Sequence, residues 1–396
     1  MGTNVDSALP SIETPSQPVG QERFAWLALA MTPGLGPRRI LRAVRDAGSA
    51  EEILSLPLTG LEALQFPAQA VQFIADGKAL DEAHKELEAL QKSGAAFLTY
   101  SDSAYPERLR EIFDAPALLW IRGDAALLTK SAIAVVGTRH PTRYGSGMAE
   151  MLSRDLAARG LVILSGMARG VDTSAHKGAL AAKGKTIAVW GTGIDVIYPK
   201  ENKSLAEQIL ATGGTIVSEL PMGTFPAPQN FPKRNRILSG MSIGVLVVEA
   251  GEHSGTRVTA RCALEQNRDV FAVPGNVTTK NAWGPNTLIK QGARLTATWE
   301  DVWEDLPSQI RVELESEWKL ASKDHPAASL FEEAPLPPAE TWVMSVLRHD
   351  EALQLDEIME KLEPELSSSE VFTALFELEL AGRIKQLPGK NYVKSF

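Results

Sequence analysis

The hydrophobic pattern divides the chain into a helical first part, an alternating middle part and a helical last part. Between about residues 95 and 305, short apolar runs rich in Val and Ile alternate with amphipathic stretches of helical length. Continuous apolar strands joined by helical crossovers are typical of a parallel sheet that is covered on both faces. We therefore predict an α/β domain with an extended Rossmann-like, doubly wound, mostly parallel sheet. Its strands are expected at 133–136, 161–164, 186–190, 215–217, 243–248 and 270–273.

The flanking parts predict further domains. Residues 21–92 have helical periodicity, and their turn Pro33-Gly-Leu-Gly-Pro37 is typical of a helix-hairpin-helix, in which glycine amides at a helix start can bind a phosphate. An ordinary Gly-Pro connection between helices has the same residues. Residues 338–396 show three helical stretches and a two-strand hairpin, which predicts a winged helix. The full division is a disordered leader (1–20), a helical domain (21–92), a Rossmann-like domain (93–305), a linker (306–337) and the winged helix (338–396).

Composition restricts the location and the chemistry. The chain has 396 residues, no apolar run of membrane-spanning length and no basic-then-apolar start typical of a secretory signal, so we expect a soluble cytoplasmic protein without a membrane span. The single cysteine, Cys262, excludes an internal disulfide, and its apolar helical neighbours predict a core position. The formal net charge of −9 argues against a protein that coats DNA over its whole surface, but it allows a local basic pocket.

Glycine, hydroxyl and cationic residues follow nearly every predicted strand. Ligands of open α/β sheets bind beyond the carboxyl ends of the strands, so these residues are expected along one edge. Glycine lets a ligand approach the backbone, and amides at helix starts bind anions. The edge therefore predicts a site for several phosphates. The candidate binding residues are Gly137, Thr138, Arg139, Ser165, Gly166, Arg169, Lys200, Asn202, Lys233, Arg234, Asn235, Arg236, Ser254 and Gly255.

Several kinds of chemistry are not supported by this edge. The loop after the first strand lacks the G-x-G-x-x-G fingerprint, and the chain has no P-loop motif, so no nucleotide cofactor is expected. No cluster with metal-ligand spacing stands out, and no metal is expected. Asp172 and His176 are four residues apart and suit either an acid/base pair or, as we favour, a helix-start cap with a histidine whose hydrogen bonds are satisfied. Glu219 and Glu249 end strands and are expected to orient loops rather than to catalyse. Arg169 also suits a structural pair with Asp172.

The middle part resembles the DprA/Smf family of DNA-processing proteins, and the resemblance covers about residues 95–305. The motifs that carry it are Ala134-Val-Val-Gly-Thr-Arg139 with Tyr144-Gly145, Ser165-Gly-Met-Ala-Arg-Gly-Val-Asp172 with Ala175-His176, Tyr198-Pro199, Phe231-Pro-Lys-Arg-Asn-Arg236, Glu249-Ala250, Ser254-Gly-Thr256, Thr259-Ala260, Val273-Pro-Gly275 and Leu288-Ile289 with Gly292-Ala293. The flanking domains resemble the family more loosely, as a helical SAM-like or hairpin domain and a winged helix.

The resemblance implies a function without catalysis. Members of this family bind and protect single-stranded DNA, load the RecA recombinase onto it, notably in natural transformation, and tend to form homodimers. The resemblance assigns strand contacts to Arg139, to Lys200 and to the run from Arg234 to Arg236. This chain has Thr138 where many members have serine, which keeps the hydroxyl. It also has Trp190 where a smaller residue is common, and that indole suits either the core or a stack on a base.

Two alternatives use the same sheet edge. A nucleotide phosphoribohydrolase-like enzyme needs a Gly-rich phosphate loop with a nearby Glu and Arg, to which residues 249–256 are only distantly similar. A sensor of free nucleotides is the other alternative.

The third helix of the winged helix carries Glu370, Glu377 and Glu379 but no Lys or Arg, which favours a protein contact over DNA recognition. Lys385, Lys390 and Lys394 of the hairpin are its plausible DNA contacts.

Overall fold

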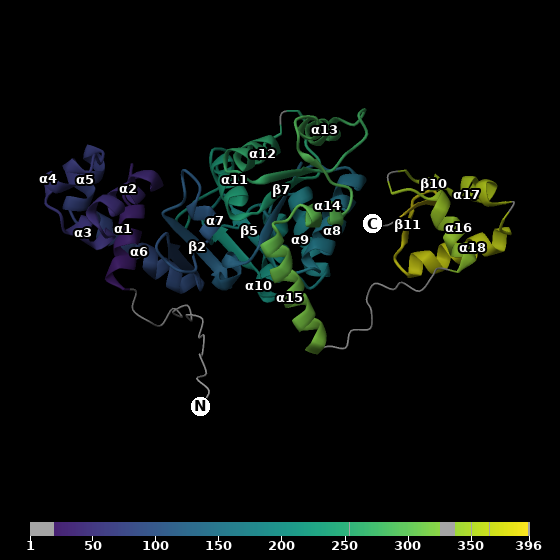
Figure 1. Ribbon diagram of the computed structural model, residues 1–396, viewed down its shortest axis with the longest axis horizontal. Coiled ribbons are helices and arrows are strands. Elements are labelled where there is room, and N and C mark those ends of the chain that lie inside the picture. Colours follow the sequence, from purple (N-terminus) through teal and green to yellow (C-terminus); the bar gives the residue numbers. More distant parts are fainter. Residues whose placement is uncertain (1–19, 253, 325–336, 350, 364, 395–396) are drawn as a thin grey trace.

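The computed structural model describes residues 20–252, 254–324, 337–349, 351–363 and 365–394. Within these residues, one sheet carries nine strands in the order β1-β2-β6-β5-β4-β3-β7-β8-β9 (Figure 1). Neighbours from β6 to β9 pair in parallel, whereas β1 and β2 form an antiparallel edge. The strands are β1 (Ala96–Thr99), β2 (Leu118–Gly123), β3 (Ala132–Val136), β4 (Val162–Ser165), β5 (Thr186–Trp190), β6 (Thr215–Ser218), β7 (Gly244–Val247), β8 (Asp269–Ala272) and β9 (Arg294–Leu295).

The direction in which the sheet grows reverses beside β3. From β3 the chain adds β4, β5 and β6 on one side, and it then returns to add β7, β8 and β9 on the other. This reversal is the switch point of a doubly wound sheet, where ligands bind in open α/β folds. The predicted Rossmann-like class is therefore confirmed. The crossover helices are α8 (Arg143–Ala157), α9 (Val171–Ala181), α10 (Lys203–Ala211), α11 (Asn230–Met241), α12 (Thr256–Glu265) and α13 (Trp283–Lys290).

Alternate residues of the central strands pack into two cores on opposite faces of the sheet. In β3, Ile133 and Val135 pack with residues of α8 and α9, whereas Ala134 and Val136 pack with residues of α11 and α12. Successive side chains of a strand point to opposite faces, so a strand that is apolar at every position needs helices on both sides. The continuous Val and Ile runs of the sequence have this cause.

The three strands that the hydrophobic pattern did not predict are β1, β2 and β9. The first two pair as antiparallel neighbours at the edge, outside the alternation of strand and helix. The last has only two residues. The periodicity of a parallel sheet therefore gives no signal for them.

The N-terminal helical region packs directly on the sheet. Its helices are α1 (Gln21–Ala30), α2 (Pro37–Ala47), α3 (Ala50–Ser55), α4 (Leu58–Ala63), α5 (Ala68–Ala75) and α6 (Lys78–Ser93). One hydrophobic core contains residues of these helices together with Trp120 and Ile216 of the sheet. The buried Glu86 carboxylate joins the two parts, because it accepts hydrogen bonds from Trp120 Nε1 at 2.7 Å and from Met222 N at 2.8 Å.

The first half of the expected linker at 306–337 is a helix, which corrects that expectation. Helix α14 (Trp299–Glu304) is followed by α15 (Ser308–Asp324). Ile310 and Leu314 of α15 are buried in the core that contains α8. The linker residues 325–336 and the leader residues 1–19 lie outside the described residues.

The C-terminal residues form a small domain with its own core. Helices α16 (Pro338–Val346), α17 (Leu355–Leu362) and α18 (Ser368–Leu380) enclose it, and β10 (Leu353–Gln354), β11 (Ile384–Leu387) and β12 (Asn391–Lys394) form a sheet in the order β10-β12-β11. The predicted winged helix is confirmed, with the two-residue strand β10 as an addition. Among the described residues, no helix is long and apolar enough to cross a membrane.

Candidate nucleic-acid interface

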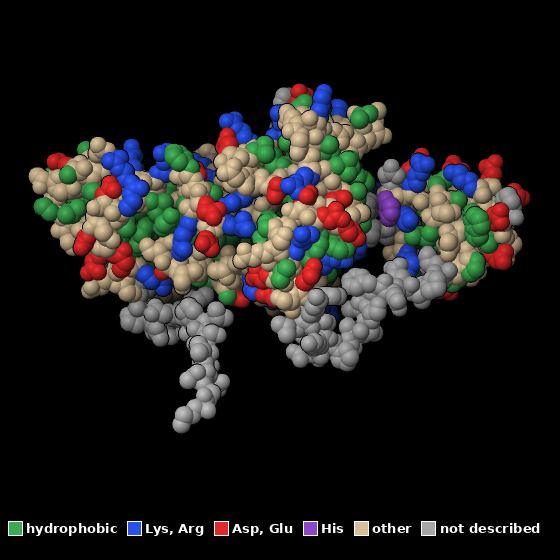
Figure 2. Space-filling model, in the orientation of Figure 1, with side chains coloured by type: hydrophobic (Ala, Val, Ile, Leu, Met, Phe, Trp, Pro, Cys, Tyr) green, Lys and Arg blue, Asp and Glu red, His purple; other side chains and the backbone are tan. Residues whose placement is uncertain are grey.

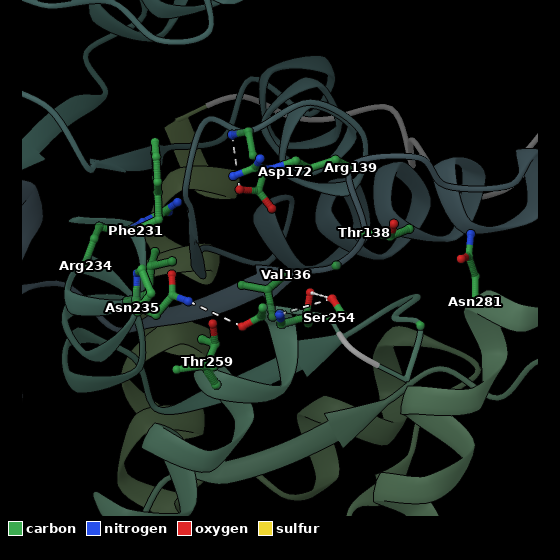
Figure 3. Close-up of a pocket in the computed structure, with 18 residues that line it drawn as sticks. Val136, Thr138, Arg139, Asp172, Phe231, Arg234, Asn235, Ser254, Thr259 and Asn281 are labelled. Carbon is green, nitrogen blue, oxygen red and sulfur yellow. Dashed lines mark hydrogen bonds between the residues drawn. The ribbon is translucent and has the colours of Figure 1, made fainter. Parts of the chain in front are cut away.

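An open cleft of about 540 Å³ lies at the switch point between β3 and β7 (Figure 3). It is formed by the loops after β3, β4 and β7, by helix α11 and by the start of helix α12. Its lining residues are Val136, Gly137, Thr138, Arg139, Ala168, Asp172, Phe231, Pro232, Arg234, Asn235, Leu238, Gly251, Ser254, Gly255, Thr256, Val258, Thr259 and Asn281.

The first turn of helix α12 supplies neutral hydrogen-bond donors to the cleft. Gly255 precedes the helix and has no side chain that could cap it. Ser254 and Thr256 place two hydroxyl groups 3.0 Å apart, and Thr256 N donates to Ser254 Oγ at 3.2 Å. Helix N-termini attract anions through their free amides and the helix dipole. This side of the cleft therefore suits a phosphate group.

Arg234 is a buried cation at the floor of the cleft. Its side chain is 7% exposed, and its Nε and Nη1 atoms have no hydrogen-bond partner among the described residues. Burial lowers the pKa of the Arg234 guanidinium; Asp172 acts in the opposite sense, and the nearby positive charge of Arg139 lowers this pKa further. Two cations that disfavour each other's charge are both stabilised by an anion placed between them.

Gly166 makes room for this buried guanidinium. A Cβ atom built on Gly166 would overlap the guanidinium group of Arg234. The glycine after β4 therefore serves the close approach of a side chain, rather than the approach of a ligand to the backbone that the sequence suggested.

Arg139 and Phe231 form the outer wall of the cleft. The exposed Arg139 lies over the Phe231 ring, with its guanidinium carbon 5.5 Å from the ring centroid. The loop that carries Arg139 is held at its base, because Thr138 N donates to Glu249 O at 2.7 Å. Sequence reasoning did not select Phe231, although it begins the quoted run 231–236. An aromatic ring beside two arginines offers a stacking surface next to phosphate-binding charge.

Glu249 uses both carboxylate oxygens to hold neighbouring loops. One oxygen accepts from Thr142 Oγ1 at 2.5 Å, and the other accepts from Thr142 N at 2.8 Å and from Asn281 Nδ2 at 3.3 Å. Glu219 accepts an ion-pair hydrogen bond from Arg236 at 2.6 Å. Both carboxylates thus have the loop-orienting contacts that we favoured for them.

Nine of the fourteen candidate residues lie together. Seven line the cleft, namely Gly137, Thr138, Arg139, Arg234, Asn235, Ser254 and Gly255. Gly166 and Arg169 line a small crevice that adjoins the cleft and shares Arg139, Phe231 and Arg234 with it. Arg169 pairs with Glu201, and the alternative that it pairs with Asp172 is wrong.

The other five candidates lie outside the cleft, and three of them have structural contacts. Ser165 is fully buried and donates to Val135 O at 2.7 Å. Asn202 is buried and donates to Met167 O at 2.8 Å. Arg236 forms ion pairs with Asp114 and Glu219 on the other side of α11. Lys200 and Lys233 are exposed, and neither lines the cleft.

Asp172 and His176 are buried and do not form an acid/base pair in the cleft. Asp172 accepts hydrogen bonds from Gly166 N and Ala168 N, both at 3.2 Å, so it closes the loop before α9. Burial raises the pKa of its carboxyl, and Arg234 opposes that shift. His176 lies a turn further along α9, with Nδ1 2.7 Å from Thr186 Oγ1. The favoured alternative is therefore only partly correct: His176 is buried, but the Asp172 side chain does not cap α9, and His176 Nε2 has no hydrogen-bond partner among the described residues.

The buried His176 predicts acid sensitivity of the fold. Burial, and secondarily Arg234, lowers the pKa of its imidazole from 6.5 to about 3. Between these values the unfolded chain binds a proton that the folded chain does not, so stability should fall as the pH falls. Urea unfolding at about pH 7.5 and about pH 5 should show this loss, and His176→Asn should reduce it. The control His84→Asn changes an exposed histidine on α6 and should leave the loss unchanged. An equal loss in wild type and His176→Asn would contradict this origin.

Two further expectations concern Cys262 and Trp190. Cys262 is half-buried on α12, which corrects its predicted core position. Trp190 is buried in the core that joins the helical region to the sheet, which leaves it unable to stack on a ligand.

Within the described residues, no group of three His, Cys, Asp or Glu side chains could hold a metal ion.

The fold and the cleft define an α/β protein with two arginines and a helix N-terminus at the switch point of its sheet. The chain belongs to the family of DNA recombination-mediator protein A, whose model matches residues 96–307, and the DprA winged helix domain matches residues 326–390. The resemblance to DprA/Smf DNA-processing proteins is thereby confirmed.

Relatives in several bacteria match large parts of the chain. Protein Smf of Escherichia coli is 41% identical over 290 residues, which are 73% of this chain and 75% of that protein. DNA processing protein DprA of Bacillus subtilis is 44% identical over 224 residues, which are 56% of this chain and 75% of that protein. The X-ray structure of DprA from Streptococcus pneumoniae covers 74% of this chain and 99% of its own, with 32% identity and a TM-score of 0.61.

Proposed function

We propose that this DNA-processing protein binds single-stranded DNA in the switch-point cleft without altering it chemically. The observation that carries the proposal is the buried Arg234, which forms no ion pair among the described residues and lies close enough to Arg139 for their charges to repel. Asp172 favours the charged guanidinium, but two buried nitrogen atoms of Arg234 keep no hydrogen-bond acceptor among the described residues, so the group indicates a site that an anion completes.

A single strand fits the cleft better than an isolated phosphate does. Arg139, Arg234 and the N-terminus of α12 offer separate phosphate contacts, and Phe231 offers a ring on which a base can stack. Contacts of this kind hold backbone and bases without selecting a sequence. Ser254 and Gly255 then serve as donors to phosphate oxygens, and Arg169 in the adjoining crevice extends the positive charge.

Membership of the recombination-mediator family supports two finer proposals. The bound strand is protected and transferred to the RecA recombinase, as in natural transformation, which implies action in the cytoplasm. The protein acts as a homodimer, and two linked clefts on one strand raise the apparent affinity over that of one cleft.

A phosphoribohydrolase-like reaction is the alternative for the same edge. It needs a carboxylate directed at the substrate, but both oxygens of Glu249 accept hydrogen bonds from Thr142 or Asn281. A sensor of free nucleotides would need no such carboxylate, and strand length distinguishes it from the proposed function.

The test is fluorescence anisotropy with oligo-dT of increasing length at several salt concentrations, together with an assay for adenine release from AMP. We expect affinity to rise with length and to fall steeply with salt, because each phosphate contact releases counterions. Adenine release, or binding of mononucleotides as tight as binding of long strands, would contradict the proposal.

Deletion of residues 338–396 is expected to leave most of the affinity for single strands. Helix α18 exposes Glu370, Glu377 and Glu379 together with Phe372 and Phe376, a surface that repels phosphates and lacks cations. The truncated and full-length chains should therefore bind oligo-dT within about threefold of each other. A large loss in the truncated chain, with an unchanged melting temperature of the remaining domains, would assign the main DNA contacts to the winged helix.

A further inference from the structure

Helix α2 presents a row of exposed arginines that the proposed site does not use. Arg38, Arg39, Arg42 and Arg45 are exposed, whereas Ile40 and Ala43 face the core. Figure 2 shows Lys and Arg side chains gathered over α2. The helix has one acidic residue, Asp46, which lies 3.5 Å from Arg42 and 3.6 Å from Arg45. The face therefore keeps an excess of positive charge in a chain that is acidic overall.

Phe113 brings an exposed aromatic ring to the end of this row. It lies in the loop between α7 (Glu107–Arg110) and β2, and it is 79% exposed. The guanidinium carbon of Arg38 stands 3.8 Å from the centroid of its ring. A phenylalanine this exposed gains little from burial in the fold, and a ring beside a guanidinium is the arrangement on which single-stranded bases stack.

A groove links this ring to the cleft. Phe113, Pro232 and Lys233 line a groove of about 800 Å³, and Pro232 also lines the cleft. Lys233 is exposed and forms no ion pair among the described residues. The surface thus runs from Phe231 in the cleft, past Lys233 and Phe113, to the arginines of α2.

The acidic side chains of the groove are each paired with an arginine. Asp114 pairs with Arg236 at 2.9 Å, and Glu111 with Arg268 at 2.9 Å. Glu265 pairs with Arg261 at 2.8 Å. Paired carboxylates repel a phosphate much less than isolated ones do, so the groove does not block a nucleic-acid strand.

We propose that a single strand leaving the cleft continues through this groove to α2. This inference rests on the proposed function of the cleft. One base stacks on Phe113, Lys233 contacts the backbone beside the cleft, and Arg38, Arg42 and Arg45 contact the phosphates beyond it. The helical region is then part of the single-strand path, and strands longer than the cleft gain affinity from it.

The test compares a short and a long oligo-dT, of about 6 and about 25 nucleotides, on the full chain. The triple variant Arg38→Gln, Arg42→Gln, Arg45→Gln should bind the long strand about tenfold more weakly and the short strand within twofold of wild type. The matched control Lys78→Gln, Lys85→Gln, Lys92→Gln removes three exposed cations from α6 of the same helical region. It should bind both strands like wild type.

The role of Phe113 is tested separately, with one variant that lacks an aromatic ring and one that carries a different ring. Phe113→Ala should weaken long-strand binding about fivefold, and Phe113→Trp should restore it, because stacking needs an aromatic face and not this particular ring. Melting temperatures equal to that of wild type ensure that a loss of affinity is not a loss of fold.

The outcomes separate the two proposals. Long-strand affinity that is unchanged in the triple variant, or lowered equally in the α6 control, overturns the path over α2. The proposal is also overturned if the triple variant loses affinity for double-stranded DNA but binds the long single strand like wild type. If the short strand does not bind, or binds independently of Arg139, the proposed function of the cleft fails, and the path fails with it.

Discussion

Replacing Arg139 with alanine is expected to weaken single-strand binding about tenfold or more and to reduce the salt slope by about 0.7. The guanidinium is exposed at the mouth of the cleft and stands over Phe231, so the substitution removes one phosphate contact and one side of a stacking platform. It disturbs no buried contact, and the melting temperature should not change. Anisotropy titrations with oligo-dT over a series of salt concentrations measure both quantities.

Arg261→Ala is the matched control for this experiment. Arg261 is an exposed arginine on α12 that pairs with Glu265 and does not line the cleft. The variant changes the net charge by the same amount and should bind a short oligo-dT confined to the cleft like wild type, because the Glu265 carboxylate that it leaves unpaired lines the groove and not the cleft. If Arg139→Ala keeps its full affinity at low salt, the cleft is not the binding site.

Replacing Gly166 with alanine is expected to abolish most of the binding and to destabilise the fold by about 1–3 kcal/mol. The new methyl group would occupy the place of the Arg234 guanidinium, which would have to swing away from Gly166 into the open cleft that it lines. Arg234 must then leave its position beside Asp172, and the cleft loses its inner cation. Thermal unfolding and anisotropy titration measure the two effects.

A double-mutant cycle shows whether the overlap with Arg234 causes the losses of stability and binding expected for Gly166→Ala. Adding Gly166→Ala to Arg234→Ala should change stability and affinity little, because the side chain that the methyl group displaces is already absent. The control Gly251→Ala adds a methyl group at another glycine of the cleft, where no atom lies within 4 Å of the new Cβ, and should keep wild-type stability. Additive effects in the double variant would contradict this mechanism.

The hydrophobic pattern predicted the fold well because a buried parallel sheet gives a strong signal. Runs such as 133–136 are apolar at every position, and both faces of β3 are in fact covered by helices. The antiparallel edge strands β1 and β2 gave no comparable signal. The position of the candidate site at one sheet edge was also predictable, since the carboxyl ends of parallel strands meet there.

The role of each site residue was predicted less well, because loop residues were treated as if all faced the ligand. The run 231–236 belongs to helix α11, so its side chains divide between two faces. Phe231 and Arg234 face the cleft, whereas Lys233 and Arg236 line the groove on the other side. Helical periodicity within the run would have indicated this division.

Polar residues next to the strands were the other difficulty. Ser165 and Asn202 use their side chains to satisfy buried carbonyl groups, and a sequence cannot show whether a polar group faces a carbonyl or a ligand. The acidic composition was similarly uninformative about the site, because the cations of the cleft are a small and local part of the total charge.

Photo-cross-linking is the most direct test of the claim that a single strand lies in the switch-point cleft. An oligonucleotide with 5-iodouracil at every position is bound to the full chain, and the complex is irradiated. The peptides that become attached to the oligonucleotide are then identified by mass spectrometry. The account predicts cross-links to the peptide that contains Phe231, their loss in Arg139→Ala, and additional cross-links to Phe113 only with long strands. Cross-links confined to the winged helix, or unaffected by Arg139→Ala, would contradict it.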